Sequence, residues 1–274
     1  MNMFGVMNMV STKEILLFDS VGKYLFSKKI PLNKVILQTG NPNGKEQYND
    51  YCFRNSITLD KGMNIACVEY FEWLCSRYMY QYKNSKEDVI LPKNTDFTKI
   101  EKTFLCLNRV HRWQRVNLFL LWNIYNLMDD TYFTLNKKSG LPSDRPLQDV
   151  FDTKLIEKYN IADDYLDKLE STLPLELDEF KSSAEMALLH GPIDSYYQSS
   201  LISVVTETNT THIFNTEKIF KPMVHRQPFI VVGPYKTLEN LRKMGYKTFS
   251  EFWDESYDDI KDPTERLVKV VELC

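Results

Sequence analysis

Two stretches of this sequence carry side chains that could bind the phosphate groups of a substrate. The first, Asn108–Arg115, holds three arginines and a histidine, and the second, Glu207–Lys218, ends in Thr-Glu-Lys. Arginine donates paired N–H groups that match phosphate oxygens, and the first turn of a helix adds free backbone N–H groups. Both stretches are therefore candidates for binding a diphosphate and for stabilising it as a leaving group.

The first stretch lies at a predicted strand-to-helix junction. The apolar run Thr103–Leu107 is typical of a buried strand, and Arg112–Leu127 has apolar residues at helical spacing. Arg115 directly precedes the apolar part of that helix, so we expect its backbone to be held rigidly. Arg109 and Arg112 come earlier, where we expect a freer loop and weaker, solvent-screened contacts. The alternative for this stretch is a solvated basic turn without a ligand.

The second stretch follows another predicted strand, the apolar run Leu201–Thr206. Glu207 comes directly after that run, and a helix is predicted over Thr216–His225. Glu217 in the first turn complements the partial positive charge of a helix N-terminus, whereas Lys218 opposes it. Lys218 therefore needs a partner, which a bound phosphate or sugar would supply. The alternative is an exposed helix start.

Apolar runs alternate with helical patterns along most of the chain, which predicts an α/β fold built on parallel sheets. The predicted strands are Ile15–Phe18, Val35–Leu37, Thr103–Leu107, Tyr132–Leu135, Leu201–Thr206 and Phe229–Val232. The predicted helices include Met63–Tyr82, Arg112–Leu127, Leu147–Tyr159, Ala162–Leu169, Thr216–His225 and Pro263–Glu272. We expect a short N-terminal α/β unit over residues 1–100 and a second unit over 101–274, with a polar linker over residues 83–102. Ligands of such sheets bind beyond the carboxyl ends of the strands, so the loops after Leu107, Thr206 and Val232 are the predicted places for chemistry.

The residues from Ser203 to Gly233 resemble the donor-binding signature of the α-1,3-fucosyltransferase family. In that family a strand ends in Glu-Asn-Ser, an aromatic-Val-Thr-Glu-Lys segment opens a helix, and a Val-Pro-Val-Val strand follows. This chain reads Val-Thr-Glu-Thr at 205–208, Ile-Phe-Asn-Thr-Glu-Lys at 213–218 and Gln-Pro-Phe-Ile-Val at 227–231. Leu107-Asn108 and Arg115 are similar to the family's Ser-Asn segment and to the arginine that grips the donor diphosphate. The resemblance covers part of the second half of the chain and nothing before Lys102.

The resemblance implies a GT-B glycosyltransferase with two Rossmann-like units, the second of which binds a nucleotide-sugar donor without a metal ion. Arg115 and Lys218 would neutralise the diphosphate leaving group. Glu217 would contact ribose or sugar hydroxyls, and Glu207 would lie beside the transferred sugar. The implied catalytic residues are Glu207, Arg115 and Lys218, and the implied donor-binding residues are Asn108, Arg112, Arg115, Thr216, Glu217 and Lys218. Because Thr208-Asn209 replaces the family's Asn-Ser, the resemblance does not identify the sugar as fucose, and it places no general base.

Composition argues against several other classes of function. The chain has 274 residues, 43% apolar and 26% charged, and its net charge of −3 gives no overall cationic surface for nucleic acid. No apolar run approaches the ~18 residues of a membrane span. Five cysteines without a C-x-x-C pair indicate reduced thiols, and we expect a cytoplasmic protein. The acidic tract Phe249–Glu265 is interpreted as a solvated loop leading to a helix N-cap at Asp262, so neither a metal site nor a cofactor is expected.

The expected partners are thus a nucleotide-sugar donor and a glycan or other hydroxyl-bearing acceptor. Two alternatives stay open at this point. One is a catalytically inactive nucleotide- or glycan-binding protein of the same fold, such as a viral accessory protein. The other is a glycosyltransferase that acts on modified DNA. Turnover of a nucleotide sugar separates the first alternative from the enzyme, and acceptor screening separates the second.

Overall fold

The computed structural model describes residues 12–39, 44–67, 72, 97–137, 146–177 and 194–274, and the statements below concern these residues. The chain divides into two compact units, Met1–Leu74 and Cys75–Cys274. Each unit is described by itself. The predicted linker over residues 83–102 lies largely outside the described ranges.

The described part of the first unit includes two long helices and a two-stranded parallel sheet. Its elements are α1 (Thr12–Ser27), β1 (Ile36–Thr39), α2 (Gly44–Arg54) and β2 (Asn64–Cys67), with β1 paired to β2. Phe18 and Leu25 of α1 pack against Tyr48 and Cys52 of α2 and against Met63. These side chains form the core of the unit.

Two predictions for the first unit are wrong. The run at 15–18 is not a strand but part of α1, because Phe18, Val21 and Leu25 face one core at helical spacing. The helix predicted from Met63 does not begin there, since residues 64–67 form β2 and pair in parallel with β1. Most of the predicted helix beyond Cys67 lies outside the described residues.

The second unit contains a four-stranded parallel sheet in the order β4-β3-β5-β6. Its strands are β3 (Lys102–Leu107), β4 (Thr131–Thr134), β5 (Ser200–Thr206) and β6 (Phe229–Val232). Its helices are α4 (Trp113–Ile124), α5 (Thr153–Tyr159), α6 (Asp163–Ser171), α8 (Asp194–Gln198), α9 (Glu217–Val224), α10 (Thr237–Lys243) and α11 (Pro263–Leu273). The four strands predicted here are confirmed to within one residue at each end. The α/β fold with parallel sheets is therefore confirmed, with nine α-helices in the described part of the chain.

The helix predicted over Leu147–Tyr159 is broken in two. A 3-10 turn covers Leu147–Val150, and α5 begins after Asp152, whose side chain accepts the N–H of Lys154 at 3.0 Å. The N–H of Asp152 is itself bound by Asn117 Oδ1 of α4 at 2.7 Å. Because this amide is taken by another helix, it cannot continue the hydrogen-bond ladder of the preceding turn. The predicted N-cap at Asp262, by contrast, is confirmed at the start of α11.

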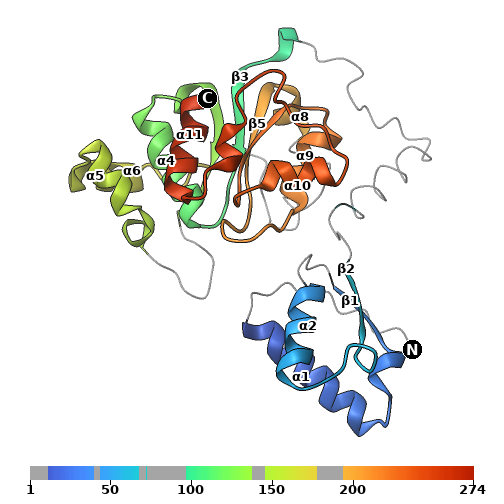
Figure 1. Cartoon of the computed structure of the whole chain (residues 1–274). Coiled ribbons are helices and arrows are strands. Elements are labelled where there is room, and N and C mark those ends of the chain that lie inside the picture. The colour runs from blue at the N-terminus through green and yellow to red at the C-terminus, as the bar shows by residue number, and fades with distance from the viewer. Residues whose placement is uncertain (1–11, 40–43, 68–71, 73–96, 138–145, 178–193) are drawn as a thin grey trace. The chain divides into compact units, whose positions relative to one another are not determined.

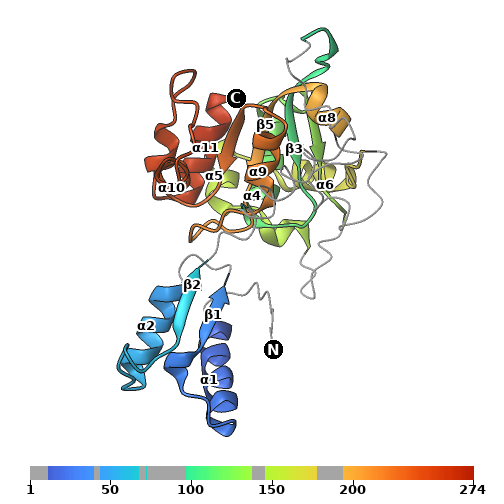
Figure 2. The ribbon, with the colours of Figure 1, turned by 90° about the vertical axis from the view of Figure 1, so that its right-hand side faces the viewer.

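Helices cover both faces of the four-stranded sheet, and the two faces can be followed in Figures 1 and 2. On one face Phe104 of β3 packs edge-on against Trp122 of α4, with ring centres 5.8 Å apart. On the other face Leu105 packs against Tyr197 of α8. Alternate residues of β3 thus point into opposite layers, as expected for a central parallel strand.

The connections that leave the two parallel central strands, β3 and β5, run to opposite sides of the sheet. From β3 the chain passes through α4 to β4 on one side, and from β5 it passes through α9 to β6 on the other. Adjacent strands whose connections diverge leave a crevice beyond their carboxyl ends, and open α/β sheets bind ligands there. The loops after β3 and β5, which we call the switch-point loops (residues 108–112 and 207–216), lie at this place.

Candidate functional site

Hydrogen bonds join the two switch-point loops. Arg112, the N-cap residue of α4, donates Nη1 to the carbonyl oxygen of Thr208 at 3.0 Å. The buried Gln114 donates Nε2 to the carbonyl oxygen of Glu207. Arg112 is half-buried, so the free, solvent-screened position expected for it is wrong, because a carbonyl of the neighbouring loop holds its guanidinium. The structure thus brings the two predicted stretches together.

Arg115 is a buried cation that lacks an acceptor for one of its N–H groups. Its side chain is 3% exposed, its Nη1 donates to the carbonyl oxygen of Val110 at 3.4 Å, and its Nε has no hydrogen-bond partner in the described ranges. Burial lowers the pKa of Arg115 to about 10, and Arg112 adds to this, whereas Glu207 and Glu217 oppose it. An unpaired buried donor costs free energy, more so on a charged group. A bound anion would remove that cost.

The carboxylate of Glu207 holds the start of α9. Its Oε1 accepts the N–H of Thr216 at 3.0 Å, and its Oε2 accepts the Thr216 hydroxyl at 2.7 Å and the N–H of Thr208 at 3.2 Å. Glu207 is 1% exposed, and burial raises its pKa although Lys218 and the bonds from Thr216 oppose the shift. Both oxygens are engaged within the chain, so Glu207 positions α9. Its predicted contact with a transferred sugar stays a prediction.

Lys218 has a partner within its own helix turn. Its Nζ lies 2.6 Å from Glu217 Oε1, and its backbone N–H donates to Oγ1 of the N-cap residue Thr216 at 3.4 Å. Burial alone would raise the pKa of Glu217, but the charge and hydrogen bond of Lys218 outweigh it and lower that pKa. Glu217 therefore supplies here the partner that Lys218 needs at a helix start. Both side chains are partly exposed, so they can also reach a ligand.

Asn108 ties together the ends of three strands. Its N–H donates to Thr134 Oγ1 of β4 at 2.8 Å, and the Thr206 hydroxyl of β5 donates to its Oδ1. Its Nδ2 donates to Cys106 Sγ at 3.1 Å. Asn108 thus fixes the loop that carries the arginines, and the donor contact implied for it stays a prediction.

Two further buried side chains at this edge present unpaired polar atoms. They are His111, whose Nδ1 has no partner, and Asn215, whose Oδ1 has none although its Nδ2 donates to Met244 Sδ at 3.4 Å. In the described part of the chain, four buried side-chain N or O atoms lack a partner, and the fourth residue besides these two and Arg115 is Trp253. Three of the four thus lie in or directly after the switch-point loops. Asn215 is not among the site residues that the sequence predicts, and its place directly before Thr-Glu-Lys is the one signal that could have marked it.

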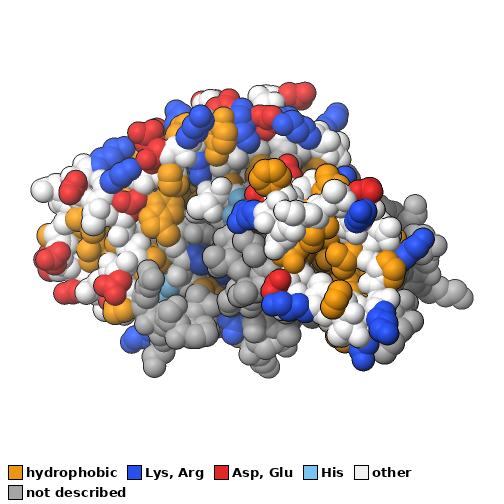
Figure 3. Space-filling view, turned by 60° about the horizontal axis from the view of Figure 1, so that its bottom comes forward, with side chains coloured by type: hydrophobic (Ala, Val, Ile, Leu, Met, Phe, Trp, Pro, Cys, Tyr) orange, Lys and Arg blue, Asp and Glu red, His pale blue; other side chains and the backbone are white. Residues whose placement is uncertain are grey.

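Positive charge exceeds negative charge at this edge. The cations are Arg109, Arg112, Arg115, Lys218 and Lys221, and the carboxylates are Glu207 and Glu217. Figure 3 turns the bottom of Figure 1 toward the viewer and shows basic and acidic side chains scattered among apolar ones, with small patches of histidine. Such a surplus of cations, partly withdrawn from water, favours an anionic ligand.

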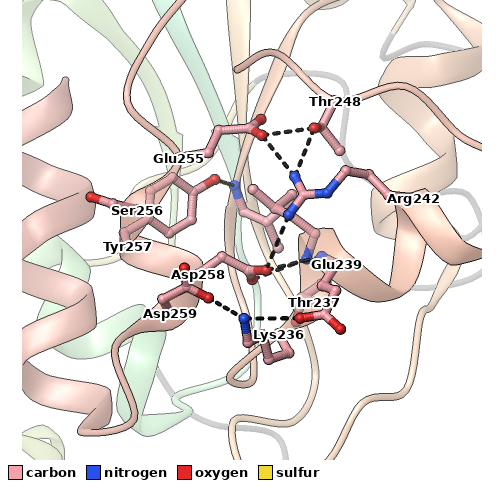
Figure 4. Close-up of polar contacts among 12 residues, drawn as sticks. Lys236, Thr237, Glu239, Arg242, Thr248, Glu255, Ser256, Tyr257, Asp258 and Asp259 are labelled. Atoms are coloured by element: carbon pink, nitrogen blue, oxygen red, sulfur yellow. Dashed lines mark hydrogen bonds and ion pairs between the residues drawn. The ribbon is translucent and has the colours of Figure 1, made fainter.

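The loop after β6, the third predicted place for chemistry, is closed by the chain itself (Figure 4). Asp258 accepts the N–H groups of Leu238 and Glu239 at 3.0 and 2.9 Å, which places a carboxylate at the first turn of α10. Arg242 forms an ion pair with Glu255 at 3.0 Å. The acidic tract is thus not simply a solvated loop, because Glu255 and Asp258 hold α10 and its surroundings together. In the described ranges, no group of three or more His, Cys, Asp or Glu gathers as a metal site.

No family model, curated protein or solved structure matches this chain. Among the helices that the structure describes, none has the length and apolar character needed to cross a membrane.

Proposed function

We propose that this chain is a glycosyltransferase of the GT-B type that binds a nucleotide-sugar donor at the switch-point loops. The supporting observation is that three of the buried, unpaired polar atoms belong to residues in or just after these loops, where cations outnumber carboxylates. Native structures satisfy nearly all buried polar groups, so a cluster of exceptions calls for a missing partner. The sequence resemblance to α-1,3-fucosyltransferases supplies the identity of that partner. Rossmann-like units, an acceptor side in the first unit and a cytoplasmic location are parts of the same proposal.

The proposed mechanism rests on stabilisation of the leaving group. Arg115 is held by its helix and directs a buried guanidinium toward the diphosphate, where it gains the acceptor that its Nε lacks. Lys218 adds a second cation, because its ammonium can contact the phosphate while it stays paired with Glu217. Charged donors fixed in advance stabilise the developing negative charge without having to reorganise during the reaction. Glu207 and Asn108 hold both cations in place through the bonds described above.

Transfer should proceed without added metal, because cationic side chains neutralise the diphosphate in this proposal. A panel of UDP-, GDP-, CMP- and dTDP-sugars is first screened by thermal shift, since a ligand that binds only the native state raises its melting temperature. The sugar that stabilises the protein most is then tested for hydrolysis and transfer in excess EDTA. We expect undiminished turnover. Strict dependence on Mg²⁺ or Mn²⁺ would contradict the proposal.

Lys218→Ala should lower kcat/KM for the nucleotide sugar about 10- to 150-fold, the effect of losing one charge-assisted contact of ~1.5–3 kcal/mol. The melting temperature should fall by only about 2–4 °C, because one partly exposed ion pair is lost. The matched control is Lys243→Ala, which removes a lysine whose side chain is 70% exposed and paired with Glu239. Equal kinetics for the two variants would show that Lys218 does not meet the donor.

One observation favours a second candidate, a nucleotide- or glycan-binding protein without catalysis. Glu207 is one of the three residues expected to be catalytic, yet both oxygens of its carboxylate are bound within the chain. A protein that only binds would need Arg115 and Lys218 but no reactive carboxylate. This candidate would be the correct one if a nucleotide sugar raised the melting temperature of the protein but was not turned over with any acceptor in a panel of glycans.

A further inference from the structure

The ring of His111 has one satisfied and one unsatisfied nitrogen. Nε2 lies within hydrogen-bond distance of the backbone carbonyl oxygen of Asn136. A carbonyl oxygen can only accept a hydrogen bond, so Nε2 carries the proton. Nδ1 is buried and has no partner among the described residues, and the whole residue is 8% exposed.

The guanidinium of Arg115 binds the same loop, one residue before His111. Arg115 donates Nη1 to the carbonyl of Val110, the residue directly before His111. The next residue along the chain is Arg112, which is also a cation. In a neutral ring with the proton on Nε2, Nδ1 is an acceptor.

An acceptor beside a cationic donor fits only certain ligands. A phosphate with all its oxygens ionised can satisfy Arg115, but it has no proton to donate to Nδ1 of His111. A hydroxyl group can donate to Nδ1. The two unpaired atoms together therefore match a molecule that carries a phosphate and a neighbouring hydroxyl, as a phosphorylated sugar or a nucleotide does.

We propose that His111 is a specificity-determining residue whose Nδ1 accepts a hydrogen bond from a sugar or ribose hydroxyl of the ligand that Arg115 binds through phosphate. The site then selects a phosphorylated polyol over a bare inorganic anion. The inference rests on the proposed function for the place of the ligand, but it does not require that the ligand be turned over.

Two variants of His111 test the roles of its two ring nitrogens one at a time. His111→Gln places an amide near the position of Nε2, so it can keep the bond to Asn136 while removing the acceptor. His111→Asn places its amide near Nδ1, so it keeps a polar group there and gives up the bond to Asn136. The probes are GDP and UDP, which carry ribose hydroxyl groups, and inorganic pyrophosphate, which carries no sugar hydroxyl, each titrated by calorimetry into the full chain.

We expect His111→Gln to weaken GDP or UDP binding about 5-fold, the effect of losing one neutral hydrogen bond, and to leave pyrophosphate binding unchanged. His111→Asn should retain more of the nucleotide affinity and have the lower melting temperature of the two. Equal weakening of nucleotide and pyrophosphate would overturn the inference, since the ring would then bind phosphate. Unchanged affinity for all three probes would overturn it by showing that His111 only supports the loop.

The inference about His111 and the proposed function can fail independently, and the experiments distinguish the two failures. If nucleotides bind with the expected dependence on His111 but no nucleotide sugar is turned over, the inference about His111 holds and the glycosyltransferase proposal fails. If neither nucleotide nor pyrophosphate binds the wild-type protein at millimolar concentration, both fail.

Discussion

Arg115→Met should weaken nucleotide-sugar binding about 100-fold while leaving the melting temperature unchanged or higher. The loss in affinity follows from removing a charge-assisted contact of ~1.5–3 kcal/mol to the diphosphate. The stability result follows from burial, because Arg115 is 3% exposed and its Nε lacks an acceptor. Methionine fills a similar volume and leaves no unsatisfied charged donor in the interior, which offsets the lost attraction to Glu207 and Glu217. Calorimetric titration and thermal unfolding of the same samples measure both effects.

The neighbouring arginines provide controls for this prediction. Arg115→Lys keeps the charge but not the paired donors, so its affinity should lie between those of the wild type and the methionine variant. Arg109→Ala and Arg112→Ala should be milder, although Arg112→Ala also removes the bond to the Thr208 carbonyl. If Arg112→Ala proved as damaging as Arg115→Met, the register taken from the resemblance would be wrong by one helical turn. Unchanged binding in all these variants would refute the donor site.

Glu207→Ala should lower the free energy of unfolding by about 3 kcal/mol, because two buried donors of Thr216 and the N–H of Thr208 lose their acceptor. Glu207→Gln keeps one acceptor oxygen and should cost about 1 kcal/mol. Urea denaturation of the wild type and both variants measures the difference. A residue that acted only on the transferred sugar would give the opposite result, with activity lost and stability preserved.

The dependence on pH checks the environment assigned to Glu207. Burial raises its pKa above the value of about 4.5 that it has in the unfolded chain. The folded state therefore binds the proton of Glu207 more tightly than the unfolded state does. This tighter binding makes its whole contribution to the free energy of unfolding below about pH 4.5, and the contribution is lost as the pH rises through the folded pKa. Glu207→Gln cannot ionise, so its deficit relative to the wild type should shrink as the pH rises. A deficit that grew with pH would mean that the carboxylate is stabilised in its charged form.

The fold of the second unit could be predicted because its strands are short, wholly apolar runs such as Phe229–Val232, which is buried at all four positions. The first unit was harder. A run of four apolar residues at 15–18 fits a buried strand and a buried helix equally well. Only the packing of Val21 and Leu25 against the same core shows that the run belongs to a helix. The break before α5 depends on Asn117, which is distant in sequence and captures the N–H of Asp152.

The site could be predicted only in part. Its two loops follow from the rule that parallel strands end at one edge, which places Arg115 and Glu207 near each other without any knowledge of their contacts. The direction of each side chain could not be deduced. That Glu207 accepts from Thr216 and that Lys218 pairs with Glu217 depend on the path of the loop between residues 207 and 216. Likewise, nothing in the acidic tract indicates that Asp258 would bind the first turn of α10.

The packing of α11 has a consequence for how the second unit forms. Figures 1 and 2 show α11 beside α4, and α11 also packs against β6, although α4 directly follows the first strand of this sheet. β3 likewise pairs with β5, which lies far along the chain. Contacts of such long sequence separation slow folding, because the intervening loop must close before they can stabilise the product. During synthesis, the side of α4 that packs against α11 therefore stays exposed until the last helix of the unit has been made, and chaperones bind apolar surface of this kind.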